Sequence, residues 1–160
     1  MAWTTRLLVV ANQTLDSPEL LGYLRGRAAS GPVNVTFVVP ARLGEEAAAK
    51  ARLEAVIAQL ESAGIEATGS VGDAEPCGAA LYVFDARSHD EIVVSTLPNS
   101  TSQWLAIDLP HRLRKATDAQ IHHVAASVPR PAPAAIPVAE VTRPKPPWFE
   151  RLFPLGSARR

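Results

Sequence analysis

The sequence predicts an α/β fold in which helices cover both faces of a parallel β-sheet. Apolar runs of strand length alternate along the chain with segments whose apolar residues recur at helical spacing, which is the pattern of such folds. The chain has 160 residues, of which 47% are hydrophobic, so it is long enough for one well-packed domain and too short for two. Strands are expected at Leu7 to Ala11, Val33 to Val39, Ile65 to Val71, Glu91 to Thr96 and Gln120 to Ala125. About four helices are expected between them, from Pro18 to about Gly26, Glu45 to Ala63, Pro76 to about Arg87 and Leu105 to Ala116.

The first strand is continuously apolar, as a strand buried on both faces would be. Ser17 provides an N-cap for the first helix, Pro18 suits its first position, and Glu19 complements the helix dipole. The second strand is rich in β-branched residues and ends at Pro40. These signals place the first two strands on either side of one helix.

The second helix has the strongest helical pattern in the chain. Its apolar residues recur at helical spacing, and they are Leu53, Val56, Ile57 and Leu60. Gly64 follows, where helices commonly end in glycine. The third strand is weaker, and Gly69 within it indicates a sheet edge or a bulge.

The second half of the chain continues the alternation. Gly72 and Asp73 precede a helix that opens at Pro76, and the fourth strand follows Asp90. Pro110 interrupts the last helical segment, and a proline either begins a helix or kinks one.

The composition changes at about Ala126. Eight of the 14 prolines fall in residues 127–160, and such a segment buries too little apolar surface to offset its ordering entropy. We therefore expect a domain of residues 1–125 and a disordered tail of residues 126–160. Near the end of the tail, four apolar residues share one side of a helical turn or two: Trp148, Phe149, Leu152 and Phe153. This segment could dock into a protein partner, lie on an anionic membrane surface, or fold back onto the domain.

Charge and cysteine content exclude several classes. The net charge is zero, and residues 1–124 carry 10 Lys and Arg against 14 Asp and Glu, so the domain lacks the clustered basic residues of a nucleic-acid surface. Cys77 is the only cysteine and forms no internal disulfide. No apolar stretch approaches the roughly 20 residues that span a bilayer, and no signal peptide is evident. A cytoplasmic protein is expected.

The loop after the fourth strand falls where many α/β folds hold a phosphate. The segment from Ser95 to Trp104 contains no glycine, which would let backbone N–H groups approach a phosphate, and Pro98 removes one donor. Its hydroxyl and amide groups remain available to an anion, although the same residue types are ordinary in loops and caps. If a nucleotide binds, we expect it to contact Asn12, Thr14, Ser95, Thr96, Asn99, Ser100, Thr101 and Ser102.

Four segments together resemble the universal stress protein family, over about residues 5 to 124. They are RLLVVANQT from Arg6, VGDAEPCGAAL from Val71, DEIVVSTLPNS from Asp90 and LPHRLRKATDAQIHHV from Leu109. The resemblance implies a doubly wound sheet of order 3-2-1-4-5, commonly in a homodimer that pairs through the last strand.

ATP-binding members of that family carry an Asp after strand one and a Gly-x-x-Gly, about nine residues, then Gly-Ser or Gly-Thr after strand four. This chain has Asn12 at the Asp position, Ser95 and Pro98 at the early glycines, and Asp108-Leu109 near the Gly-Ser. The resemblance therefore supports the fold far better than it supports ATP.

No catalytic residue and no metal site is expected. His122 and His123 point to opposite faces of a strand and are poorly placed to share an ion, and His89 and His111 lie elsewhere. Cys77 is interpreted as a small buried residue. No spacing indicates a triad or paired catalytic carboxylates.

The sequence thus predicts a non-catalytic, universal-stress-type regulatory or interaction module, a homodimer through its fifth strand with no cofactor. Two alternatives stay open. One is an adenine-nucleotide sensor that uses the corner between strands one and four. The other is a dimeric scaffold whose tail docks a partner or a membrane surface.

Overall fold

Five parallel strands form one sheet in the order β3-β2-β1-β4-β5. The strands are β1 (Thr5–Val10), β2 (Val33–Pro40), β3 (Glu66–Gly72), β4 (Glu91–Thr96) and β5 (Gln120–Ala125). This confirms the doubly wound α/β fold and the strand order that the resemblance implied. The structure is a computed structural model that describes residues 2–98 and 103–127. Ala126, where the tail was expected to begin, is buried and donates its N–H to the Thr96 carbonyl, and the predictions made for residues 128–160 lie outside the described residues.

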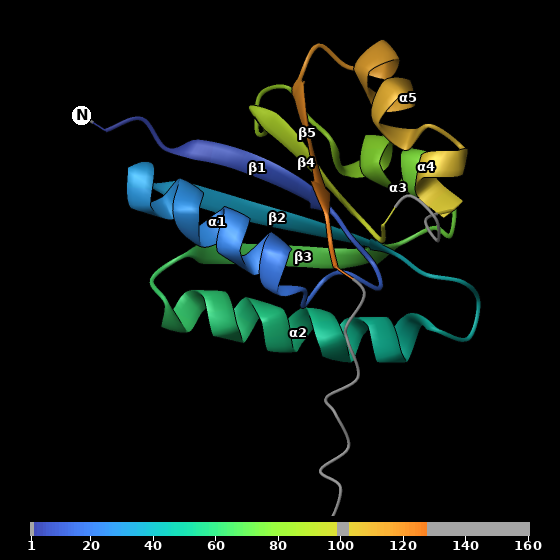
Figure 1. Cartoon of the computed structure of the whole chain (residues 1–160), viewed down its shortest axis with the longest axis horizontal. Coiled ribbons are helices and arrows are strands. Elements are labelled where there is room, and N and C mark those ends of the chain that lie inside the picture. The colour runs from blue at the N-terminus through green and yellow to red at the C-terminus, as the bar shows by residue number, and fades with distance from the viewer. Residues whose placement is uncertain (1, 99–102, 128–160) are drawn as a thin grey trace, which may run out of the picture. The chain divides into compact units, whose positions relative to one another are not determined.

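Helices cover both faces of the sheet. They are α1 (Pro18–Ser30), α2 (Glu46–Ser62), α3 (Pro76–Val83), the one-turn α4 (Gln103–Ala106) and α5 (Leu109–Ala116). Figure 1 shows α1 and α2 on one face and α3, α4 and α5 on the other. By its contacts the chain divides into two units, Met1–Val128 and Pro129–Arg160, and every described residue belongs to the first.

Three of the expected helix boundaries were wrong. The first helix ends at Ser30, about one turn beyond the expected end near Gly26. The third helix ends at Val83 instead of near Arg87, because Phe84 is extended, with φ −63° and ψ 126°. The single helix expected from Leu105 to Ala116 is two helices. They are separated because Asp108 adopts the left-handed conformation, with φ 52° and ψ 48°, and Pro110 lies in the first turn of α5.

The central strand, β1, supplies the core on both sides of the sheet. Leu7 and Val9 pack on the side of α1 and α2, and Leu8 and Val10 pack on the side of α3 and α5. All four side chains are fully buried, and burying each contributes about 1.5–3 kcal/mol relative to leaving it exposed. The continuous apolar run seen in the sequence is therefore explained by burial on two faces.

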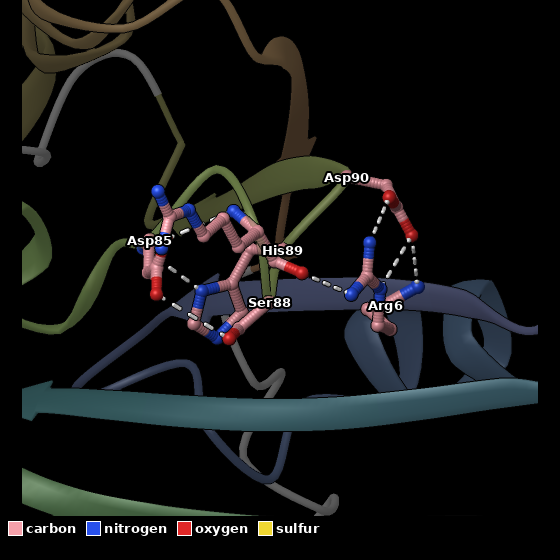
Figure 2. A network of polar contacts seen from close by, with 6 residues as sticks. Arg6, Asp85, Ser88, His89 and Asp90 are labelled. Carbon is pink, nitrogen blue, oxygen red and sulfur yellow. Dashed lines mark hydrogen bonds and ion pairs between the residues drawn. The ribbon is translucent and has the colours of Figure 1, made fainter.

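A polar network fixes the amino end of β4 beside that of β1 (Figure 2). The Asp90 carboxylate accepts a hydrogen bond from the Arg6 backbone N–H at 2.9 Å and pairs with the Arg6 guanidinium, Nη2 to Oδ1, at 2.7 Å. The Asp90 N–H returns a bond to the Arg6 carbonyl at 2.8 Å. The hydrogen bonds from Arg6 lower the pKa of Asp90.

His89, which comes directly before Asp90 in the chain, is buried. Its Nδ1 accepts a hydrogen bond from the Asp85 backbone N–H at 3.2 Å, and its ring stacks on Phe84 with centroids 6.0 Å apart. Burial lowers the pKa of His89 below its ordinary value, so the imidazole stays neutral to lower pH in the folded chain than in the unfolded one.

In the described part of the chain, no helix is long and apolar enough to cross a membrane.

The close approach of β3 to β2 gives a first prediction. A Cβ on Gly69 would lie 2.8 Å from the Phe37 Cβ and 3.0 Å from the Phe37 carbonyl oxygen, and backbone cannot easily move aside. We expect Gly69→Ala to lower the free energy of unfolding by about 1–3 kcal/mol in urea titrations. The control is Gly22→Ala in α1, where a Cβ meets no atom within 4 Å. A helix-interior alanine should stabilise there by about 0.5–1 kcal/mol, and a Gly69→Ala protein as stable as the wild type would contradict the contact.

His89 gives a prediction about pH. Because its folded-state pKa is lowered by burial, the unfolded chain binds the extra proton as pH falls below about 6.5, and stability decreases with it. Replacing His89 by Gln should flatten the fall in Tm between about pH 6.5 and 5, whatever its effect on the absolute Tm. The matched control is His111→Gln, which makes the same substitution at an exposed position of α5. An unchanged slope in His89→Gln would show that this histidine titrates alike in both states.

Candidate functional site

A polar cavity of about 260 Å³ lies at the carboxyl ends of β1, β2 and β4. The chain leaves β1 toward α1 on one face of the sheet, whereas α4 and α5 follow β4 on the other face. Such a switch point is where parallel α/β sheets open a crevice for ligands. The lining residues are Asn12, Gln13, Thr14, Pro40, Arg42, Glu45, Ala74, Ser95, Thr96, Leu97, Gln103 and Trp104.

Asn12 reaches the cavity wall but uses its side chain to join three elements. Its Nδ2 donates to the Pro40 carbonyl at 2.8 Å, which ties the end of β1 to the end of β2. Its Oδ1 accepts from Arg52 Nη2 of α2 at 2.9 Å, and Arg52 Nη1 also donates to the Asn12 carbonyl at 3.3 Å. Both functional atoms of the Asn12 amide are therefore hydrogen-bonded within the protein.

Thr14 and Ser95 meet at the floor of the cavity. Ser95 Oγ donates to Thr14 Oγ1 at 2.7 Å, and both side chains are buried. This bond connects the loop after β1 to the end of β4, across 81 residues of sequence. A hydroxyl has one proton and two acceptor positions, so the pair can still bond a polar group in the cavity.

Thr96 points to the opposite face of β4 from Ser95. Its Oγ1 lies 2.7 Å from Nε2 of His123 on β5, and its carbonyl accepts from the Ala126 N–H at 2.8 Å. Burial lowers the pKa of His123, which favours the neutral ring, and the tautomer of that ring decides whether Nε2 donates or accepts in the bond with Thr96. The pair joins β4 to β5 beside the cavity.

The cavity mouth carries one positive and one negative side chain. Arg42 and Glu45 belong to the turn between β2 and α2, in which the Glu45 N–H donates to the Arg42 carbonyl at 2.9 Å. Arg42 Nη2 approaches Gln103 Oε1 of α4 at 3.5 Å, which is the long limit of a hydrogen bond. The half-buried Trp104 packs against the core next to Gln103.

Sequence reasoning identified some of these residues and missed others. The cavity brings together four of the residues expected to hold a nucleotide: Asn12, Thr14, Ser95 and Thr96. The other four, Asn99, Ser100, Thr101 and Ser102, lie outside the described residues. Sequence reasoning missed Arg42, Glu45 and Gln103. Arg42 and Glu45 could have been predicted as site residues, because they follow the carboxyl end of the predicted strand Val33 to Val39, and ligands bind at that edge of a parallel sheet. Trp104 lines the cavity and packs on the core.

Asp108 adopts a backbone conformation that glycine favours. It is the one described residue other than glycine with a positive φ, and a left-handed conformation costs roughly 1–2 kcal/mol for a residue with a Cβ, although Asp tolerates it better than most. The resemblance places a Gly-Ser pair near this position. The exposed Asp108 does not line the cavity.

The histidines go to separate places. His122 lies on the α1 side, with Nε2 2.7 Å from Glu91 Oε2, and Glu91 is held by two hydrogen bonds of 2.9 Å from Arg27. These bonds lower the pKa of Glu91. His123 lies on the other face against Thr96, so the expectation that adjacent histidines diverge is confirmed. Among the described residues, no three His, Cys, Asp or Glu side chains gather as metal ligands.

Cys77 is buried at the start of α3, as expected. Burial raises the pKa of its thiol, which keeps the sulfur protonated and unreactive at neutral pH.

In sequence comparisons, no protein-family model and no curated protein matches this chain.

Proposed function

We propose that this chain is a cytoplasmic, non-catalytic regulatory or interaction module of the universal-stress type, and that its corner between β1 and β4 does not hold ATP. The supporting observation is the hydrogen bonding of the corner. Both atoms of the Asn12 amide are bonded to Pro40 and Arg52, and Ser95 is bonded to Thr14. A nucleotide would have to displace the bonds of Asn12, and Ser95 and Thr14 would offer it only the hydrogen-bonding capacity that their mutual bond leaves over.

The size and charge of the cavity support the same proposal. Its volume of about 260 Å³ lies below the range of roughly 300–1,000 Å³ typical of sites for drug-sized ligands. Arg42 and Glu45 balance one another in charge, so the described lining offers no net positive field to a triphosphate.

The proposal that the chain is not a catalyst depends on one pair of side chains. Among the described residues of the corner, Thr96 and His123 are the hydroxyl and imidazole that lie within hydrogen-bonding distance of each other. Thr96 and His123 stand at the distance of a nucleophile and its base. However, the Thr96 side chain is only 2% exposed, and no carboxylate among the described residues bonds His123 to orient it. Such a pair joins two strands more readily than it attacks a substrate.

The test is calorimetric titration of the full chain with ATP, ADP and AMP, after a check for co-purified nucleotide. We expect no saturable heat at nucleotide concentrations up to about 1 mM, which corresponds to binding weaker than about 4 kcal/mol. Micromolar binding that Asn12→Ala or Ser95→Ala weakens would instead support the alternative of an adenine-nucleotide sensor. The control variant is Gly22→Ala, far from the corner in α1.

We also propose that the chain forms a homodimer through β5. Among the described residues, no strand pairs with the outer side of β5, and an unpaired strand edge is a ready template for another chain. The strand Gln120–Ala125 contains no Asp, Glu, Lys or Arg, so its outer edge is not shielded by such charged side chains.

Light scattering should give twice the mass of the chain at micromolar concentrations. Lysines introduced at the exposed ends of β5, as Gln120→Lys with Ala125→Lys, should shift the mass to that of a monomer, because like charges on an edge oppose pairing. Ala48→Lys, at an exposed position of α2, is the control and should stay dimeric. A monomer mass for the unmodified chain would remove the dimer from the proposal.

A further inference from the structure

The cavity mouth carries two opposite charges that form no ion pair among the described residues, although Arg42 reaches Gln103 Oε1 at 3.5 Å. Arg42 and Glu45 are both exposed and both line the cavity. Among the described residues, neither forms an ion pair and the Glu45 carboxylate accepts no hydrogen bond. By contrast, Arg6, Arg27 and Arg112 each pair with a carboxylate. What distinguishes Arg42 and Glu45 from other exposed charged residues is that both line the cavity.

Both charges are held by one turn. The Glu45 N–H donates to the Arg42 carbonyl, which fixes the two residues three positions apart around Leu43 and Gly44. Gly44 has φ 89°, and its N–H donates to the Glu46 carboxylate at 2.7 Å. The Glu46 carboxylate is thus engaged in the turn, whereas that of Glu45 is left to the cavity.

We infer that the cavity binds a small zwitterion, an α-amino acid, with its carboxylate on Arg42 and its ammonium on Glu45. A guanidinium holds a carboxylate through two parallel N–H donors, and a free carboxylate is the natural acceptor for an ammonium group. The inference deepens the proposed function, on which it rests, because it names the ligand that would regulate a module whose corner does not take ATP.

The volume and the floor of the cavity fit this class. A cavity of about 260 Å³ equals the liquid volume of about nine water molecules, which suits an amino acid. The hydroxyls of Thr14 and Ser95 line the floor and keep hydrogen-bonding capacity for a short polar side chain. Trp104 provides an apolar wall for its carbon atoms.

The charge pattern also decides between small ligands. A simple anion would be attracted to Arg42 and repelled by Glu45, and a simple cation would meet the reverse. A zwitterion pairs with both groups at once. Removing one charge, from the ligand or from the protein, therefore breaks one of the two ion pairs and leaves the former partner of that charge unpaired.

The experiment titrates the full chain with each of the twenty common α-amino acids and follows heat and the shift in Tm. We expect one or more with a short polar side chain to bind at micromolar to low millimolar concentration and to raise Tm in proportion to saturation. For the tightest binder, two close analogues are then titrated, the α-hydroxy acid and the primary amide. Each should bind at least about tenfold more weakly, because each removes one ion pair.

Matched variants assign the site. Arg42→Gln and Glu45→Gln should each weaken binding at least about tenfold and keep the wild-type Tm without ligand, since both residues are exposed. The controls are Arg25→Gln in α1 and Glu61→Gln in α2, exposed residues that make the same changes in charge away from the cavity. They should bind as the wild type does.

Two results would overturn the inference. One is the absence of heat and of any Tm shift with all twenty amino acids at 10 mM. The other is saturable binding that Arg42→Gln and Glu45→Gln leave unchanged. Neither result touches the proposed function, because its tests are the separate titration with adenine nucleotides and the light-scattering mass.

Discussion

Burial of β1 on both faces is the constraint on which the rest of the structure depends. Its four core side chains divide equally between the helix pair α1 and α2 and the pair α3 and α5. Because β1 pairs with β2 on one side and β4 on the other, its position sets that of both neighbours. Its two ends then carry different polar arrangements, and these arrangements decide what each end of the sheet can do.

The amino end of β1 is closed by charge pairing. Arg6 gives its backbone N–H and its guanidinium to Asp90, and Asp90 returns its own N–H to the Arg6 carbonyl. These bonds fix where β4 begins and leave Asp90 no free oxygen. The carboxyl end is different, because the chain after β1 and the chain after β4 turn to opposite faces and leave a cavity between them.

The polar residues of that cavity fall into two sets, those bonded to other parts of the protein and those exposed at the mouth. Asn12, Thr14 and Ser95 hold the strand ends together through hydrogen bonds with other parts of the protein. Arg42 and Glu45 at the mouth form no ion pair among the described residues, and the side chain of Arg42 makes only the long contact of 3.5 Å with Gln103. A buried polar group without a partner is costly, whereas an exposed charge is solvated by water. The inner residues are therefore structural first, and the residues at the mouth are the ones free to select a ligand.

The sequence by itself determined the fold. The continuous apolar run of β1, the N-cap at Ser17 and the helical spacing in α2 are local signals, because side-chain periodicity and capping act over a few residues. The strand order followed from the resemblance, and the part of the site near Asn12 and Ser95 could be placed because parallel strands bring their carboxyl ends together. The tertiary structure alone decided how these residues are used. Thr14 meets Ser95 across 81 residues, and Asn12 meets Arg52 across 40. Such pairings depend on how distant segments are placed by packing, and no local pattern reports whether a polar side chain faces a ligand or another part of its own chain.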